Sequence, residues 1–170
     1  MKIKTERLTL HSFEDEDIET LCGILTNETI GKTYLLPEFK NDDAVFALAK
    51  RLQILSMRDD RYVWGIYQNK TLIGMLNDTD IQGENIEIGY ALHPDYYNQG
   101  FATEVVKAVI TYLFEKGFST IYAGAFENNL ASIRVMEKSG MKKMNSRASI
   151  DYRGKTYQCV YYSIKKEKKL

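Results

Sequence analysis

The sequence predicts a mixed α/β (α+β) fold, in which helices interrupt a run of β-strands. Apolar residues recur at helical spacing in some segments, and short apolar runs bounded by turn residues occupy others. Glycine follows two of the helical segments, at Gly117 and Gly140, as is typical of helix ends. Because 170 residues suit one domain and no linker or repeat interrupts them, we expect residues 1–170 to form a single domain.

The N-terminal third of the chain predicts one short strand and two helices. The strand covers residues 8–10. A capping-box-like Ser12 starts the first helix, which runs to about Leu25. Residues 27–39 show no clear period, and Asn41 then caps a second helix that ends near Met57.

The rest of the chain alternates strands with helices. Residues 62–68 and 71–78 predict a hairpin, and residues 80–84 turn into a strand at 86–92. Near residues 98–102 a loop becomes a helix that ends at Gly117. The remaining elements are predicted at 120–126 (strand), 127–138 (helix), 141–150 and 155–164 (strands that meet at 152–154).

Composition limits the classes of protein to which this chain can belong. Lysine plus arginine equals aspartate plus glutamate at 23 each, so no basic surface for nucleic acid is expected. The apolar runs are too short to span a membrane and the N-terminus lacks the apolar core of a signal peptide, so we expect a cytoplasmic protein. Cys22 and Cys159 form no C-x-x-C pair, which favours small buried residues over a metal site or a disulfide.

The stretch from Asn85 to Thr103 contains the first candidate site. It joins an apolar strand through His93 and Pro94 to a loop that contains Gly100 and opens a helix. Such a turn presents unpaired backbone N–H groups and the positive end of a helix dipole, so it can hold a phosphate. An equally strong interpretation is a plain strand–turn–helix connection in which Gly100 supplies an unusual backbone angle. Neither the P-loop nor the dinucleotide-binding spacing occurs in the chain.

Three segments carry a resemblance to the GNAT acetyltransferases. Tyr97, Gly100 and Ala102 occupy the three positions of the acetyl-CoA motif [QR]-x-x-G-x-[GA], with tyrosine in place of the usual polar residue. Residues 129–141 resemble the family segment N-x-x-S-x-R-V-x-E-K-x-G-F, with methionine in the last position. The opening TERLTLHSF is similar to the TERLxLRxF start of the RimJ/RimL-type branch, with His11 in place of arginine.

The resemblance implies a fold and a cosubstrate. The order of the predicted elements matches the GNAT order along nearly the whole chain, which implies a mixed, mostly antiparallel central sheet flanked by helices, with splayed central strands. The cosubstrate would be acetyl-CoA, without a metal. Its phosphates would lie on the backbone of Gln99, Gly100, Phe101, Ala102 and Thr103.

The rest of the donor would contact two further segments. Backbone N–H groups near Ala91, Leu92 and His93 would face the thioester oxygen, and His93 itself is expected to be a turn residue. By the resemblance, the Asn129 side chain would bond the pantetheine arm. Helix capping is a second interpretation of Asn129 and is compatible with the first.

Two residues are candidates for proton transfer. Many GNAT enzymes place a tyrosine acid where this chain has Met136, whereas RimJ/RimL-type proteins place a serine at the position of Ser132. The resemblance therefore implies that Ser132 is the candidate acid for the leaving thiolate; a small helix residue bonded to a backbone carbonyl is the alternative. Glu87 alternates with Ile86 and Ile88 and is the candidate base and a substrate contact. The alternative for Glu87 is an ion pair with a lysine or arginine of a neighbouring strand.

The acceptor is an amine, and its class is only weakly indicated. Tyr34 lies in the segment that the resemblance places over the acceptor, although it fits the core equally well. An α-amino group with a pKa near 7.8 is roughly 14% neutral at pH 7, whereas a lysine near 10.4 is about 0.04% neutral. This difference favours protein N-termini, as does the RimJ/RimL resemblance, whose named members modify ribosomal proteins. Small amines and drugs are substrates of the same branch.

Two readings from other classes remain beside the enzyme. A non-catalytic acetyl-CoA sensor would keep the phosphate turn without acid or base, and a peptide-binding domain would use an open sheet edge and have no affinity for CoA. Either a monomer or a homodimer is expected.

Overall fold

The computed structural model describes residues 2–167, which form two compact units. The first unit contains the chain up to Asn77 together with Tyr90–Ala102. The second unit contains Asp78–Gly89 and the chain from Thr103 onwards. Each unit therefore joins segments that are distant in sequence, and the expectation of a single domain over residues 1–170 stays a prediction.

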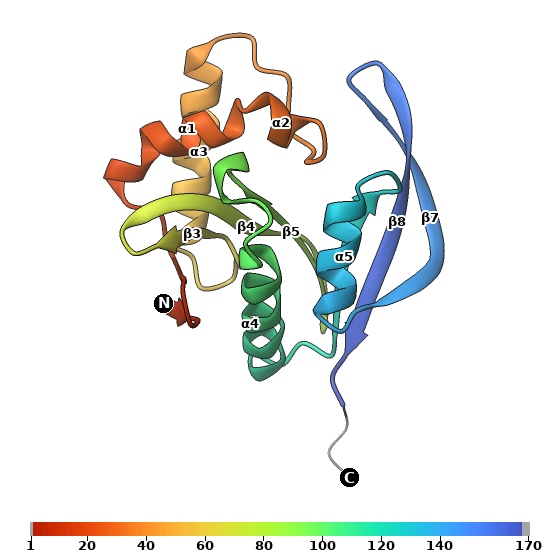
Figure 1. Ribbon diagram of the computed structural model, residues 1–170. Coiled ribbons are helices and arrows are strands. Elements are labelled where there is room, and N and C mark those ends of the chain that lie inside the picture. Colours follow the sequence, from red (N-terminus) through yellow and green to blue (C-terminus); the bar gives the residue numbers. More distant parts are fainter. Residues whose placement is uncertain (1, 168–170) are drawn as a thin grey trace. The chain divides into compact units, whose positions relative to one another are not determined.

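The helices and strands follow one another in the predicted alternation (Figure 1). The helices, with two 3-10 turns, are η1 (Asp15–Asp17), α1 (Ile18–Leu25), α2 (Glu28–Gly31), α3 (Asp42–Ser56), η2 (Pro94–Tyr96), α4 (Phe101–Glu115) and α5 (Leu130–Lys138). The strands are β1 (Lys2–Lys4), β2 (Thr9–His11), β3 (Trp64–Gln68), β4 (Thr71–Gln82), β5 (Asn85–Leu92), β6 (Thr120–Phe126), β7 (Lys142–Tyr152) and β8 (Lys155–Lys165). In the described part of the chain, no helix combines the length and the apolar character needed to cross a membrane.

The strands form one eight-stranded sheet within residues 2–167, in the order β1-β2-β3-β4-β5-β6-β8-β7. The pairs β1–β2, β2–β3, β3–β4, β6–β8 and β7–β8 are antiparallel. The β5–β6 pair is parallel, with Asn85 to Glu87 opposite Thr120 to Tyr122. The mixed, mostly antiparallel sheet with helices that the sequence predicts is therefore confirmed.

Helix α3 begins as the sequence predicts, whereas α1 begins later. Asn41 caps α3, because its Oδ1 accepts a hydrogen bond from the Ala44 N–H at 2.9 Å. The predicted start of the first helix at Ser12 is wrong, because the next residue, Phe13, is buried and donates its N–H to the Ser56 hydroxyl at 3.0 Å. That contact keeps the chain out of helical geometry until η1, and α1 follows it.

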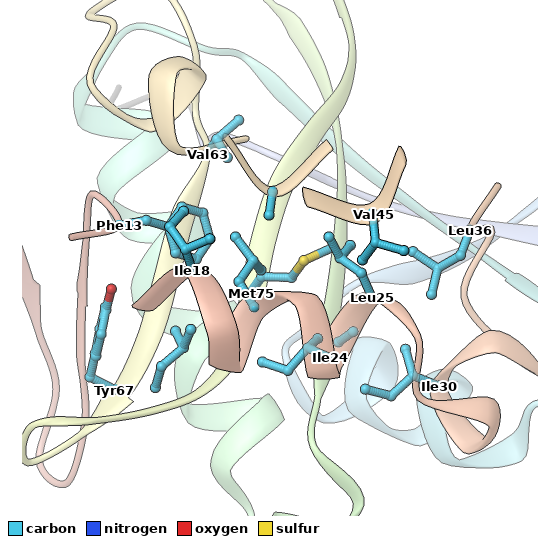
Figure 2. Close-up of a cluster of buried hydrophobic side chains, with 14 residues drawn as sticks. Phe13, Ile18, Ile24, Leu25, Ile30, Leu36, Val45, Val63, Tyr67 and Met75 are labelled. Atoms are coloured by element: carbon cyan, nitrogen blue, oxygen red, sulfur yellow. The ribbon is translucent and has the colours of Figure 1, made fainter. Parts of the chain in front are cut away.

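The core of the first unit lies where α1 packs against α3 and the neighbouring strands (Figure 1). Figure 2 shows Ile18, Ile24 and Leu25 of α1 in this cluster with Met75 of β4. Burial of one such aliphatic side chain contributes about 1.5 to 3 kcal/mol. At the edge of the cluster, Tyr67 is buried and donates its hydroxyl to Asp17 Oδ2 at 2.6 Å.

Three elements of the first unit differ from the sequence prediction. Strand β1 and the short helix α2 were not predicted, because neither is long enough to show a period. Helix α2 is held by Asn27, whose Oδ1 accepts hydrogen bonds from the N–H groups of Thr29 and Ile30. The predicted strand at 8–10 lies one residue later, as β2, where it pairs with both β1 and β3.

The predicted turn at 80–84 is also wrong, because β4 continues to Gln82. The last four residues of β4 are exposed, and all of them except Ile81 are polar, so their composition resembles that of a loop. The turn is confined to Gly83 and Glu84, and Gly83 has a φ of +59°.

The second unit buries one face of its strands. Ile86 and Ile88 of β5 and Ile121 of β6 are at most 2% exposed. Helix α5 contacts β6 and β7, and β7 and β8 form a long twisted hairpin (Figure 1). Helix α5 starts at Leu130 rather than at the predicted residue 127, because the Glu127 N–H donates to the Gln158 carbonyl at 2.8 Å and is held out of the helix.

Candidate functional site

The glycine turn of the first unit has the backbone geometry that the sequence predicts. Asn98 has a φ of +59° and Gly100 a φ of +78°. Helix α4 starts directly after Gly100, at Phe101. The first N–H groups of a helix have no carbonyl partner within that helix. Together with the helix dipole, they form a backbone site suited to a phosphate.

Hydrogen bonds within the loop hold this turn in place. The Asp95 N–H donates to His93 Nδ1 at 3.3 Å, so His93 caps η2 and is the turn residue that the sequence predicts. The Gln99 side chain donates from Nε2 to the Asp95 carbonyl at 3.2 Å. Gln99 is thus oriented by a contact four residues back along the chain.

Arg7 contacts the glycine turn from the start of the chain, and sequence reasoning missed it. Its Nη1 donates to the Gln99 carbonyl at 2.9 Å, and its guanidinium carbon lies 4.5 Å from the centre of the Phe101 ring. Its Nη2 lies 3.4 Å from the position that a Cβ atom would occupy at Gly100. Arg7 belongs to the TERL opening, but no local pattern predicts a contact across 92 residues.

The predicted role of the His93 backbone at the thioester oxygen is wrong. Its N–H already donates to the Ile73 carbonyl at 2.7 Å, because the end of β5 lies close to β4. The predicted role of Ala91 and Leu92 as N–H donors to that oxygen stays a prediction.

Tyr34 lies against the core of the first unit. It packs beside the buried residues of that cluster, and its hydroxyl donates to Asn77 Oδ1. Burial raises the pKa of the Tyr34 phenol above its ordinary value. The core interpretation of Tyr34 is therefore supported, and its role as a substrate contact stays a prediction.

Glu87 of the second unit points away from the buried face of β5. It is half-buried, whereas its neighbours Ile86 and Ile88 are buried, as the alternation in the sequence predicts. Burial and the nearby charge of Asp80 raise the pKa of Glu87, and a hydrogen bond from Thr79 acts in the opposite direction. No lysine or arginine within residues 2–167 forms an ion pair with Glu87, which disfavours the structural ion pair.

Gly124 and Tyr161 lie beside Glu87 and were not predicted. Gly124 of β6 pairs with Tyr161 of β8 and is exposed. A Cβ atom on Gly124 would lie 2.9 Å from Cε1 of Tyr161 and 3.6 Å from Oε1 of Glu87. Burial, followed by the charge of Glu87, raises the pKa of the Tyr161 phenol. The signal in the sequence was a glycine inside an apolar strand, which often marks a close approach.

The first turn of α5 carries the other predicted residues. Asn129 Oδ1 accepts a hydrogen bond from the Ser132 N–H at 3.2 Å, so Asn129 caps the helix. The side-chain amide nitrogen of Asn129 has no recorded partner among the described residues. Ser132 is half-buried. Met136 is fully buried, so a core side chain occupies the position where many GNAT enzymes carry a tyrosine.

The predicted residues thus form two groups, each described within its own unit. In the first unit, the loop from His93 to Ala102 is joined by Arg7. In the second unit, Glu87 lies with Gly124 and Tyr161, while Asn129 and Ser132 share a helix turn and Thr103 lies in α4.

Known proteins match the chain over nearly its whole length. Residues 7–142 match the family described as Acetyltransferase (GNAT) domain. The chain is 29% identical over 170 residues to the "Uncharacterized N-acetyltransferase YoaA" of Bacillus subtilis (strain 168), a match that covers 96% of each chain. An acetyltransferase (GNAT family) from Bacillus anthracis has a TM-score of 0.83 at 26% identity, covering 97% of this chain and 98% of that chain.

A further solved structure shares the fold at lower identity. RimL, a ribosomal L7/L12 alpha-N-protein acetyltransferase in complex with coenzyme A, has a TM-score of 0.86 at 15% identity, covering 97% of this chain and 98% of that chain. Because the family match extends from Arg7 to Lys142 and includes both motifs found in the sequence, the chain belongs to the GNAT acetyltransferase family and is an N-acetyltransferase.

Proposed function

We propose that this N-acetyltransferase moves the acetyl group of acetyl-CoA directly to a primary amine, by preference the α-amino group of a protein N-terminus. The observation that carries the proposal is the environment of Glu87. A half-buried carboxylate without a basic partner in the described chain lies beside Gly124, and glycine has no side chain to cover it. A carboxylate in that setting is suited to accept a proton from an incoming amine.

The glycine turn is proposed to bind the phosphates of the donor. The backbone from Gln99 to Thr103 would hold them, and the amide nitrogen of Asn129 would donate to the pantetheine arm while its oxygen caps α5. The coenzyme A in the RimL structure supports this choice of donor.

The reaction requires one bond to form, one to break and two protons to move. The amine nitrogen attacks the thioester carbon to form the C–N bond and a tetrahedral intermediate, and the C–S bond breaks as that intermediate collapses. Glu87 takes the proton from the amine, directly or through water, and later releases it to solvent. The Ser132 hydroxyl passes its proton to the leaving thiolate and regains one from water, so that no alkoxide is left. Backbone N–H groups of Ala91 and Leu92 would stabilise the negative oxygen of the intermediate.

The acceptor class follows from the cost of neutralising an amine. A lysine has to give up its proton against a pKa about 2.6 units higher than that of an α-amino group, which costs about 3.5 kcal/mol more. With Glu87 as a single carboxylate base, the α-amino group is the easier substrate. RimL, which shares the fold, is an alpha-N-protein acetyltransferase, and this supports the same class.

The experiment that tests the proposal measures thiol release from acetyl-CoA across N-terminal peptides, lysine peptides, polyamines and aminoglycosides, beside calorimetry of acetyl-CoA binding. We expect turnover with N-terminal peptides. Turnover confined to another amine would contradict the acceptor class. Tight binding without turnover would indicate a sensor, and no binding would contradict the proposed donor site.

Gly124 provides a sharper test of where the amine binds. Gly124→Ala places a methyl group 2.9 Å from the Tyr161 ring and 3.6 Å from Oε1 of Glu87, so that the ring has to shift in the surroundings of Glu87. We expect kcat/KM for the amine to fall by about tenfold or more, the equivalent of ~1.4 kcal/mol, while acetyl-CoA affinity is unchanged. Gly23→Ala is the matched control, because beyond its chain neighbours and the backbone of its own helix no atom lies within 4 Å of the added methyl group. If Gly124→Ala and Gly23→Ala have equal kinetics, the amine does not bind beside Gly124.

A further inference from the structure

The glycine turn contains no cationic side chain of its own. From Thr71 to Val106 the chain has neither lysine nor arginine, and Asp95 and Glu104 add negative charge close to the turn. Tyr97 occupies the position at which the acetyl-CoA motif usually has glutamine or arginine. A ligand that carries several phosphate charges would therefore meet only backbone dipoles from this segment.

We propose that Arg7 is a positioning residue of the glycine turn and supplies the positive charge that helps to hold a phosphate of the donor there. This inference rests on the proposed acetyl-CoA function. Its basis is the set of contacts from one guanidinium to three consecutive residues: the hydrogen bond to the Gln99 carbonyl, the approach to Gly100 and the stacking on Phe101.

A tight turn at the start of the chain sets the position of Arg7. The Thr5 N–H donates to the Leu8 carbonyl at 2.9 Å, and the Leu8 N–H donates to the Thr5 hydroxyl oxygen at 2.9 Å. Leu8 is buried, so the turn is anchored while Arg7 between its ends is exposed. The strands on either side of the turn, β1 and β2, pair with each other and fix its two ends.

The chemistry of arginine suits both tasks. A guanidinium has five N–H donors in a plane, so it can bond the Gln99 carbonyl and a phosphate oxygen simultaneously. Its central carbon lies over the buried Phe101 ring, and this contact helps to hold the guanidinium beside the turn. A lysine would keep the charge but lose the stacked plane and the second donor direction.

The test compares Arg7→Met and Arg7→Lys with the wild type, and uses Arg51→Met, an exposed arginine on α3, as the matched control. Acetyl-CoA affinity is measured by calorimetry at low and high salt, and kcat/KM is measured with acetyl-CoA and with S-acetyl-pantetheine, which lacks the phosphates. Thermal melting and circular dichroism check that each variant folds.

We expect Arg7→Met to weaken acetyl-CoA binding by about tenfold or more and to reduce its dependence on salt, because a screened charge is missing. Arg7→Lys should recover part of the affinity at low salt. Turnover of S-acetyl-pantetheine should be unchanged in both variants, and Arg51→Met should behave as the wild type.

Four results would overturn the inference. If the wild type binds acetyl-CoA and Arg7→Met binds it equally well, Arg7 has no role at the donor. If Arg7→Met slows S-acetyl-pantetheine and acetyl-CoA to the same extent, or if Arg7→Lys recovers nothing, the residue is structural and its charge does not act on a phosphate. If the wild type binds no acetyl-CoA, the proposed function fails, and this inference fails with it.

Discussion

At the scale of single residues, Glu87 lies in an environment that is unfavourable for a charged carboxylate. Its neighbours in the second unit are Asp80, Thr79, Cys159 and Tyr161, and none of them is a cation. A partly buried charge without a counter-ion costs free energy, so its retention points to chemistry rather than to packing.

Glu87→Gln removes the proposed base without changing the shape of the side chain. We expect kcat/KM for the amine to fall by about 10²- to 10⁴-fold, the usual contribution of a general base, while acetyl-CoA affinity is unchanged. Steady-state kinetics and calorimetry test this. A loss below about threefold would leave Glu87 without a role in proton transfer.

The activity of the wild type should depend on the ionisation of Glu87. Only the deprotonated carboxylate accepts a proton, so log kcat/KM should rise with pH through the pKa of Glu87, which lies above its ordinary value. A pH–rate profile tests this when the acceptor is an amine that stays uncharged over the whole pH range, so that its own ionisation adds no rising limb. The rising limb should then be absent in Glu87→Gln. A rising limb that persists in that variant would belong to another group.

The same substitution should stabilise the protein at neutral pH. Folding raises the pKa of Glu87, so the native state favours the protonated carboxyl more than the unfolded state does. The resulting contribution to stability is present below the unfolded pKa and is lost as pH rises through the folded pKa. Glu87→Gln removes that loss, so its free energy of unfolding should exceed that of the wild type at pH 7. The difference should vanish near pH 4 in denaturant titrations. An equal or lower stability at pH 7 would contradict the burial cost.

Ser132 is tested by its effect on turnover relative to binding. Ser132→Ala keeps the backbone N–H that donates to Asn129, so α5 remains capped. We expect kcat to fall on the order of 10²-fold, as for the loss of a general acid, with little change in acetyl-CoA affinity. Unchanged kcat would show that Ser132 only packs in the helix.

At the scale of elements, the glycine turn depends on backbone conformation rather than on side chains. Gly100→Asp places a carboxylate at the proposed phosphate site, and aspartate tolerates a positive φ better than most residues. We expect acetyl-CoA affinity to fall by at least about a hundredfold while the fold is kept.

The matched control is Gly154→Asp, because Gly154 has a φ of +74° at the turn of the β7–β8 hairpin, close to that of Gly100. It reproduces the backbone strain and the added charge in a turn that we assign no role in donor binding. Calorimetry and thermal melting of both variants separate the two effects. Similar affinity losses in the two variants would contradict a phosphate site at Gly100.

Elements with strong local signals were predicted well. The cap of α3 at Asn41, the hairpin turn between β3 and β4, and strand β6 follow from nearby residues alone. Elements set by distant contacts were not. Helix α1 starts late because Phe13 is bonded to Ser56, and α5 starts late because Glu127 is bonded to Gln158. A local pattern contains neither contact.

At the scale of the whole molecule, donor binding should raise the stability of the fold. A ligand that binds only the native state at 100 times its Kd stabilises it by about 2.7 kcal/mol, which corresponds to about 5 to 10 °C in Tm for a chain of this size. We expect this shift with coenzyme A in the wild type and its loss in Gly100→Asp. Thermal melting over a range of coenzyme A concentrations tests it, and a constant Tm in the wild type would contradict binding.

The sequence by itself determined the fold class, the family and the unusual backbone angle at Gly100. These rest on signals carried by neighbouring residues: hydrophobic period, caps, and two motifs whose members are close in the chain. The predicted alternation of Glu87 with buried isoleucines also needed only the period of a strand.

Within each unit, tertiary structure alone decided which of the candidate residues meet. It brought Arg7 to Gln99 and Phe101, engaged the His93 N–H with Ile73, and set Tyr161 against Gly124 beside Glu87. These contacts join residues far apart in the chain, and their geometry depends on strand register and on a turn at the N-terminus. Local propensity carries no information on either, because both are set by the packing of the folded units.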